Sequence, residues 1–317
     1  MKIPLTFNQG GWFYCVVSKE EMMSIWKYAF LVFLGGCSYG VVSTFVKLAY
    51  SEGFTVNDVT GTQYFFGSIM LWILSIFIPK GSLNVRQLLI LLISGTPMGL
   101  TGIFYNQSLK YVDASLAIIL LLQFTWIGMI LQFFLDKKAP SRKNLIATAV
   151  ILTGSILASG ILSASLSFSL IGCGWGLLSA LSFASFIYIS GRSTVAIHPI
   201  RKSAIMTTGA TILVFCILPP SFLTNGSLLD GLLPFALFFA FFGSFLPPLL
   251  FNIGMPKVGS GLGNILSASE LPTAVTMSTL ILQENVTLSQ WIGVSIILVG
   301  IAYPNLKKTF NVKMKGS

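Results

Sequence analysis

Charge is scarce in this chain. Only 9% of its 317 residues are Asp, Glu, Lys or Arg, whereas 54% are hydrophobic, and an ordinary soluble domain carries about 25% charged residues. Water therefore cannot be the solvent for most of the surface, and the composition indicates a lipid bilayer. The net charge of +10 does not predict nucleic-acid binding, because Lys and Arg lie in short connectors between apolar runs.

Histidine and cysteine are also scarce. His198 is the only histidine, so a His-based triad or metal site has no second member, and we expect His198 to be a solvated connector residue. The four cysteines form no CxxC motif, and three of them lie inside apolar runs, where a thiol behaves as a small hydrophobic group. The sequence predicts no disulfide framework, metal or cofactor, and it holds no nucleotide-binding loop for an ATP-driven pump.

Long apolar runs dominate what is present. A helix needs about 20 apolar residues to cross the hydrocarbon core, and ten runs approach or exceed that length. They cover 28–49, 59–79, 87–108, 114–135, 144–162, 169–191, 203–223, 231–254, 259–282 and 288–305. In lipid, backbone groups must pair within the protein, and no period-2 alternation indicates a barrel. The sequence predicts an all-α integral membrane protein with ten transmembrane helices.

Positive charges orient these helices, because cytoplasmic connectors retain Lys and Arg. With the N-terminus inside, 17 Lys and Arg residues fall on the inner side and only Lys110 on the outer side, while Lys47 lies within a span. We therefore expect a multi-pass protein of a bacterial cytoplasmic membrane with both termini inside.

The two ends of the chain differ from the helical part. Residues 1–23 are a polar stretch without the apolar core or cleavage site of a signal peptide. We interpret them as an N-terminal extension and place the natural start at Met22 or Met23; a native peptide beginning at Met1, found by mass spectrometry, contradicts this. Residues 307–317 form a basic tail, which we expect to contact anionic lipid at the inner surface.

The chain contains an internal repeat. A shift of 146 residues aligns 106–154 with 252–300 without a gap, with nine identical pairs among 49, and the connectors align as well. The predicted five-helix repeats cover 24–162 and 163–306. Because five is odd, the two copies cross the membrane in opposite senses. Such inverted repeats are typical of secondary transporters, whose halves exchange conformations around a central site.

The second half carries a set of motifs that point to a family. Residues 259–272 read GSGLGNILSASELP, and they are followed by Gln283-Glu284, Gln290-Trp291-Ile292-Gly293 and Leu298-Val299-Gly300. With Lys47 and Arg192, these residues resemble the EamA-like group of the drug/metabolite transporter superfamily over about 25–305. The resemblance implies a non-enzymatic transporter that exports a metabolite, amino acid or drug-like compound, although the group includes some importers.

The first half departs from the family pattern. It has Asp136-Lys137-Lys138 where members often show Gly-Glu-Arg. At the repeat equivalents of Glu270 and Pro272 it has Phe124 and Trp126. The first copy therefore has no mid-span carboxylate of its own.

Glu270 is the main candidate site residue. It lies twelve residues into the span 259–282, near the bilayer midplane, where an ionised carboxylate costs at least ~2.5 kcal/mol. One reading is a proton- or cargo-binding site, in which a proton is exchanged for cargo. The other is a structural glutamate that satisfies backbone groups freed by Pro272, which has no N–H. The two readings are compatible.

Further candidates lie on other spans, each with helix packing or a surface position as the alternative. For Lys47, near the outer end of the first span, we weigh pairing with Glu270, a gating or cargo role, and snorkelling to the surface. Gln123 and Trp126 share a helix face and offer an amide and a ring to cargo. Candidate aromatic walls are Tyr39, Trp175 and Tyr188. Candidate helix breaks, which point to a transporter's site when both halves carry them, are Pro97, Pro247 and Pro248.

Taken together, these features predict a secondary transporter, an exporter that works by alternating access with Glu270 central. Its expected partners are the bilayer, a small-molecule cargo and, if transport is coupled, protons; the cargo and the oligomeric state stay open. Uncoupled facilitated exchange is the first alternative. A membrane sensor or embedded enzyme is the second, but an embedded enzyme usually concentrates several polar catalytic groups at one depth, and the sequence has one mid-span carboxylate.

Overall fold

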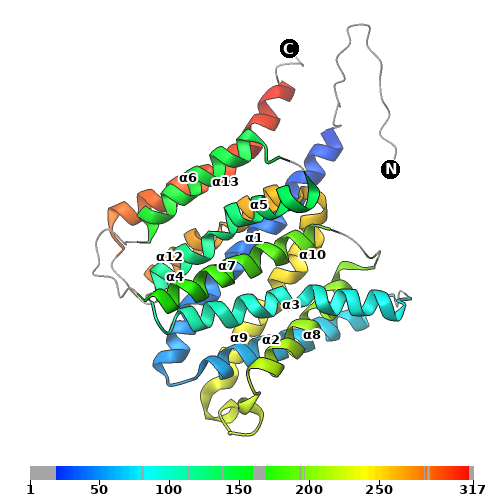
Figure 1. Ribbon diagram of the computed structural model, residues 1–317, viewed down its shortest axis with the longest axis vertical. Coiled ribbons are helices and arrows are strands. Elements are labelled where there is room, and N and C mark those ends of the chain that lie inside the picture. The colour runs from blue at the N-terminus through cyan, green and yellow to red at the C-terminus, as the bar shows by residue number, and fades with distance from the viewer. Residues whose placement is uncertain are drawn as a thin grey trace.

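The structure is a computed structural model. It describes residues 19–79, 82–112, 114–137, 139–159, 169–192, 195, 197–281, 283 and 286–313, and it describes the side chains of these residues except 19–24, 114–115 and 305–313. Most of the predicted N-terminal extension, the side chains of Met22 and Met23, and those of the basic tail lie outside this part. The described residues form helices and no strands (Figure 1).

The first half of the chain forms six helical segments. They are α1 (Lys19–Ser51), α2 (Val56–Ile76), α3 (Val85–Ser108), α4 (Ala114–Leu122), α5 (Phe124–Asp136) and α6 (Arg142–Ala158). Capping side chains fix several starts: Thr55 and Asp58 form a capping box at α2, and Asn84 and Gln87 form another at α3. Such boxes satisfy backbone N–H groups that have no partner within the helix.

The second half contains α7 (Leu170–Gly191), α8 (Pro199–Ile217) and a long, irregular helical stretch over Leu228–Val258. This stretch includes α9 (Leu233–Phe239), a π-helical turn (Ala240–Phe245) and α10 (Leu246–Val258). It is followed by α11 (Ser260–Ser267), α12 (Glu270–Ile281) and α13 (Leu288–Lys313).

The predicted bounds 203–223 were wrong for α8. The helix begins at Pro199, because proline has no N–H and suits the first helical position. It ends at Ile217, just before Pro219 and Pro220, which cannot continue the hydrogen-bond ladder. His198, just before the helix, is exposed as predicted.

The two halves share an interrupted helix. At the offset of 146, Ala114 pairs with Ser260, and Phe124 pairs with Glu270, so the starts of α4 and α5 coincide with those of α11 and α12. In both places the backbone tightens to bonds between residues three apart: the N–H of Gln123 donates to the Leu120 carbonyl, and that of Ser269 to the Leu266 carbonyl. A tightened turn inside a helix often marks a hinge.

The ends of these interrupted helices match as well. Lys137 after α5 has φ 53° and Gln283 after α12 has φ 52°, and the two are repeat equivalents. They are the two non-glycine residues with positive φ in the described part of the chain. Left-handed residues commonly end helices. The agreement extends the repeat from the amino-acid sequence to the backbone.

Helices of the two halves pack against one another. Figure 1 shows α6 beside α13 at one edge of the molecule and α2, α3 and α8 toward the opposite edge. The helix α3 packs against α7 and α8; in its repeat equivalent, α10 packs against α1, while α9 and the π-helical turn Ala240–Phe245 pack against α2. Helices of each half therefore pack against helices of the other, and both halves contribute to the centre.

Apolar side chains cover the outside of the helices. Within the part of the chain that the structure describes, seven helices are long and apolar enough to cross a membrane. They span Ile25–Ser51, Val56–Ile76, Val85–Ser108, Leu116–Asp136, Leu170–Gly191, Pro199–Ile217 and Leu228–Val258. Large exposed side chains such as Ile76, Phe77 and Phe134 form a surface that suits lipid rather than water. The prediction of a multi-pass membrane protein is supported by these helices.

Candidate functional site

A cavity lies at the centre of the helices. It offers about 60 Å³ of room to water-sized molecules, several times what one water needs. Side chains from α1, α2, α3, α4, α7 and α12 line it. They are Tyr39, Val42, Ser43, Val46, Gln63, Tyr64, Met98, Thr101, Gly102, Tyr105, Asn106, Leu121, Phe183 and Glu270. Both halves of the chain therefore contribute to one site.

Glu270 is the acidic residue of this lining. It is the first residue of α12 and is 6% exposed. No described residue donates a hydrogen bond to its carboxylate or pairs with it. A buried carboxylate without a partner is costly in its ionised form, so the cavity favours the binding of a group that removes this cost.

Two glycines of α1 hold the helix break against that helix. A Cβ at Gly36 would lie 2.8 Å from the carbonyl oxygen of Ser267, and a Cβ at Gly40 would collide with the carbonyl oxygen of Glu270. In addition, the Ser269 hydroxyl donates to the Phe33 carbonyl oxygen over 2.7 Å. The small residues allow close backbone approach and so fix the depth at which Glu270 enters the cavity.

Aromatic rings and hydroxyl groups form the other walls. The ring of Tyr39 meets that of Phe183 edge to face with centroids 5.4 Å apart. Tyr64 reaches across to α3, where its hydroxyl donates to the Met98 carbonyl over 2.6 Å. The buried hydroxyl of Tyr105 has no partner within the described part of the chain. The walls are therefore largely aromatic with a few polar atoms.

An asparagine on each half makes an equivalent contact. Asn106 of α3 donates through Nδ2 to the hydroxyl of Thr60 on α2 over 2.8 Å, and Asn252 of α10 donates to the hydroxyl of Ser203 on α8 over 2.9 Å. The two asparagines pair at the 146-residue offset. Of the two, Asn106 lines the cavity. The two repeats therefore share this helix–helix hydrogen bond, and the one in the first repeat borders the cavity.

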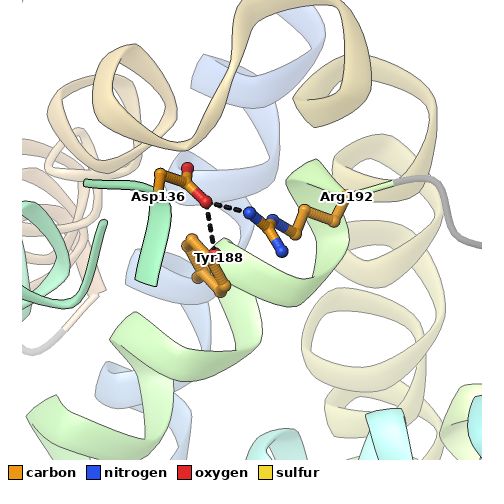
Figure 2. A network of polar contacts seen from close by, with 3 residues as sticks. All are labelled: Asp136, Tyr188 and Arg192. Carbon is orange, nitrogen blue, oxygen red and sulfur yellow. Dashed lines mark hydrogen bonds and ion pairs between the residues drawn. The ribbon is translucent and has the colours of Figure 1, made fainter. Parts of the chain in front are cut away.

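A polar network joins the end of α5 to the end of α7. Figure 2 shows Tyr188 and Arg192 directed toward Asp136. The Tyr188 hydroxyl donates to Asp136 Oδ1 over 2.7 Å, the Arg192 guanidinium pairs with the same oxygen, and the guanidinium carbon lies 4.9 Å from the centre of the Tyr188 ring. Tyr188 follows the cavity residue Phe183 by five positions, about 7.5 Å along the helix. The network therefore ties the two helices together on one side of the cavity.

The family follows from a comparison with known protein families. A model of the EamA-like transporter family matches residues 26–160 and again residues 170–305. This chain belongs to the EamA-like transporter family. The resemblance noted from the motifs is confirmed, and the chain carries two EamA repeats. Members of this family are transporters and not enzymes, which supports the same class for this chain.

A solved structure has a fold similar to that of this EamA-like chain. The chain is similar to a protein of known crystal structure with a TM-score of 0.68 and 15% sequence identity, over 87% of this chain and 98% of that one. At this identity the likeness concerns the fold. None of the curated proteins matches the chain.

The EamA-like fold brings some of the predicted site residues together. Glu270 and Tyr39 line the cavity, and Pro272 is buried two residues after Glu270 in α12. Lys47 lies on α1 one turn beyond the lining residue Ser43 and is outside the lining. Lys47 lies four residues before the end of α1 at Ser51.

Other predicted residues lie away from the cavity. Trp126 is exposed, and its Nε1 donates to Gln123 Oε1 over 2.7 Å, while Gln123 Nε2 donates to the Ile119 carbonyl. These bonds stay within one span. Trp175 packs on Phe104 with ring centroids 5.4 Å apart, and Tyr188 belongs to the network with Asp136.

The three prolines proposed as helix breaks differ in their effects. Pro97 lies inside α3, which continues as an α-helix through it. Pro247 and Pro248 lie in the first turn of α10, directly after the π-helical turn Ala240–Phe245. The breaks that occupy equivalent positions are instead those at Gln123 and at Ala268–Ser269.

Sequence reasoning missed most of the cavity walls on α2 and α3. Four lining residues were given no functional role from the sequence: Gln63, Tyr64, Tyr105 and Asn106. Gln63 and Asn106 carried a usable signal, because polar side chains inside apolar runs mark pathways in membrane proteins. The tyrosines carried none, since aromatic residues are common throughout these spans.

Proposed function

We propose that this chain is a secondary transporter that exports a small solute from a bacterial cell by alternating access, with the cavity around Glu270 as the cargo site. The observation that carries the proposal is a buried carboxylate without a partner among the described residues, in a cavity formed by both repeats and beside an interrupted helix. In transporters with inverted repeats, cargo and ion sites lie at the repeat interface and beside discontinuous helices.

Proton exchange fits the environment of Glu270. The carboxylate is buried and has no partner among the described residues, so it is stabilised by a bound proton or by cargo that interacts with it. If both use the same carboxylate, they exclude each other. Exclusive binding at one site is sufficient to couple the exit of cargo to the entry of a proton.

The topology that accompanies this proposal has ten spans in two opposed domains, 24–162 and 163–306, with both termini in the cytoplasm. Beside the seven long helices, the other three crossings are α6, the pair α11–α12, and the part of α13 over Leu288–Pro304. Reporter fusions test it: a fusion at 225 is expected on the outer side and one at 139 on the inner side. Both reporters on one side would contradict the topology.

In this topology the cavity lies nearer the outer side of the membrane. The lining residues of α1 and α3 lie in the second half of each helix, whose ends are the outer ones. The network of Asp136, Tyr188 and Arg192 lies at the inner end, where it joins the two repeats. We propose that this network stabilises the inwardly closed state and opens when the carrier turns inward.

Proteoliposomes test the transport function. Purified protein is reconstituted, and counterflow is measured for amino acids and organic cations with and without a proton gradient. We expect flux for one solute class above that of protein-free liposomes, with a rate that changes with the gradient. Flux that ignores the gradient would support uncoupled exchange, and folded protein with no flux for either class would count against transport.

A change at the inner network tests the gate. Asp136→Asn removes the ion pair with Arg192, which is 53% exposed at its side chain, and exposed pairs contribute about 0.2–1 kcal/mol. The labelling rate from the inner side of a cysteine placed at Ser43 is therefore expected to rise by about 1.5- to 5-fold. The control is Asp230→Asn, at an exposed carboxylate. An unchanged or lower inner labelling rate would contradict the gate.

A further inference from the structure

The charges of the cavity are of one sign. Glu270 is the acidic residue among the fourteen that line it, and the lining includes no Lys, Arg or His. Lys47, one turn beyond Ser43 on α1, is outside the lining. Because Glu270 is 6% exposed, water does not fully screen its charge when it is ionised. The field inside the cavity therefore favours a positive group.

Aromatic residues line the cavity together with this carboxylate. They are Tyr39, Tyr64, Tyr105 and Phe183. The face of an aromatic ring is electronegative and attracts ammonium groups within about 6 Å of its centre. The rings of Tyr39 and Phe183 pack edge to face with centroids 5.4 Å apart, so two of these walls support each other. Rings around a carboxylate suit a cation with an apolar body.

The polar atoms of the walls are mainly acceptors. Tyr64 uses its hydroxyl proton on the Met98 carbonyl, which leaves the oxygen lone pairs. Asn106 uses Nδ2 on Thr60, which leaves Oδ1 as an acceptor. Tyr105 has a hydroxyl without a partner in the described part of the chain, and Gln63 offers both kinds of group. Hydrogen bonds from an ammonium group can be accepted from several sides.

We propose that the cargo is an organic cation, with its ammonium group at the Glu270 carboxylate and its apolar body against the rings. This rests on the function proposed above and names the class of cargo. An anion would be repelled by Glu270, and the carboxylate of a zwitterion would find no cationic side chain in the lining. The exchange balances in charge: one monocation leaves as one proton binds to the carboxylate.

Three compounds with the same phenylalkyl body separate the classes: phenethylammonium carries a positive charge, phenylalanine carries both charges, and 3-phenylpropanoate carries a negative charge. Binding of each to the full chain in nanodiscs is measured by titration calorimetry at pH 7. We expect the cation to bind at least about tenfold more tightly than the other two, since like charges in an interface are strongly disfavoured.

Variants assign the binding to the cavity. Glu270→Gln keeps the size of the side chain and removes the charge, and it is expected to weaken binding of phenethylammonium at least about tenfold. The matched control Glu52→Gln changes an exposed carboxylate at the end of α1 and is expected to leave binding unchanged. No binding of the cation, equal or tighter binding of the zwitterion or anion, or equal loss in both variants would overturn the proposal.

Flux measurements keep the two proposals apart. If Glu270-dependent flux is found for phenylalanine or 3-phenylpropanoate and not for phenethylammonium, the cargo class is wrong and the transporter function stands. If folded protein shows no flux for any of the three or for the wider screen, while the cation binds, the transport function fails and only the binding of an organic cation at Glu270 stands.

Discussion

Glu270→Gln is expected to reduce flux driven by a proton gradient by at least about thirtyfold. The substitution removes the anionic partner from the proposed pair between Glu270 and cationic cargo, and removal of one partner of a buried charge pair costs about 2–5 kcal/mol. Glutamine has the shape of the protonated carboxyl group, so the packing of α12 against Gly40 on α1 is retained. What is lost is the exchange between a bound proton and cargo. Initial rates in proteoliposomes with an imposed pH gradient measure the effect.

The matched control for this variant is Glu52→Gln, which removes a carboxylate from an exposed position. Its gradient-driven flux is expected to equal that of the unmodified protein. A Glu270→Gln protein that is folded, reconstituted in equal amount and still driven by the gradient would show that coupling does not use this carboxylate.

Gly95→Leu is expected to destabilise the folded protein by about 3 kcal/mol or more, because overpacking in a close-packed interior costs about 1–3 kcal/mol and sometimes more. A Cβ at Gly95 of α3 would collide with the carbonyl oxygen of Met206 on α8, and one at Gly209 of α8 would collide with the carbonyl oxygen of Leu92 on α3. Each helix presents a glycine to the backbone of the other, so a larger side chain at either glycine requires the two helices to separate. Thermal denaturation in detergent and the monodisperse fraction measure the loss.

Gly174→Leu serves as the control for that substitution. Gly174 lies in α7, and nothing lies within 4 Å of a Cβ built there. Leucine also has a higher helix propensity than glycine, so the melting temperature is expected to stay equal or rise. Equal losses in the two variants would mean that the α3–α8 contact has no special role.

The sequence predicted the helices and the repeat well because both depend on strong, local signals. Apolar runs must form helices in lipid, and equivalent residues such as Lys137 and Gln283 adopt the same left-handed conformation because the repeat preserves the connector. The bounds of α8 were wrong, since apolar residues alone did not reveal that Pro199 starts the helix and that Pro219 prevents its continuation.

The centre of the site was less predictable than the fold. Glu270 was evident from its charge at mid-span, whereas Tyr39 was proposed as an aromatic wall with ordinary helix packing as the alternative. Which of the many aromatic residues face the cavity depends on helix rotation and packing between distant segments. Trp175, for example, packs on Phe104, whereas Tyr105, the residue next to Phe104, lines the cavity.

The pairing of Asp136 with Arg192 also depended on tertiary structure. The two residues are 56 positions apart, and only the packing of α5 against α7 brings them together. Charge alone placed both at the inner end of their helices, but it did not select this pair from the other charged residues of the inner connectors. This contact between Asp136 and Arg192 is the proposed inner gate.

Alternating access requires that one cavity opens in turn to the two sides of the membrane. The most direct test is a cysteine at Ser43, whose hydroxyl bonds only within α1 and which lines the cavity, in a protein whose four native cysteines are replaced. Its reaction with a membrane-impermeant maleimide is measured from each side in sealed vesicles of known orientation. We predict labelling from both sides, with inner labelling increased in Asp136→Asn. Labelling from one side only, in both proteins and under either direction of a proton gradient, would contradict alternating access.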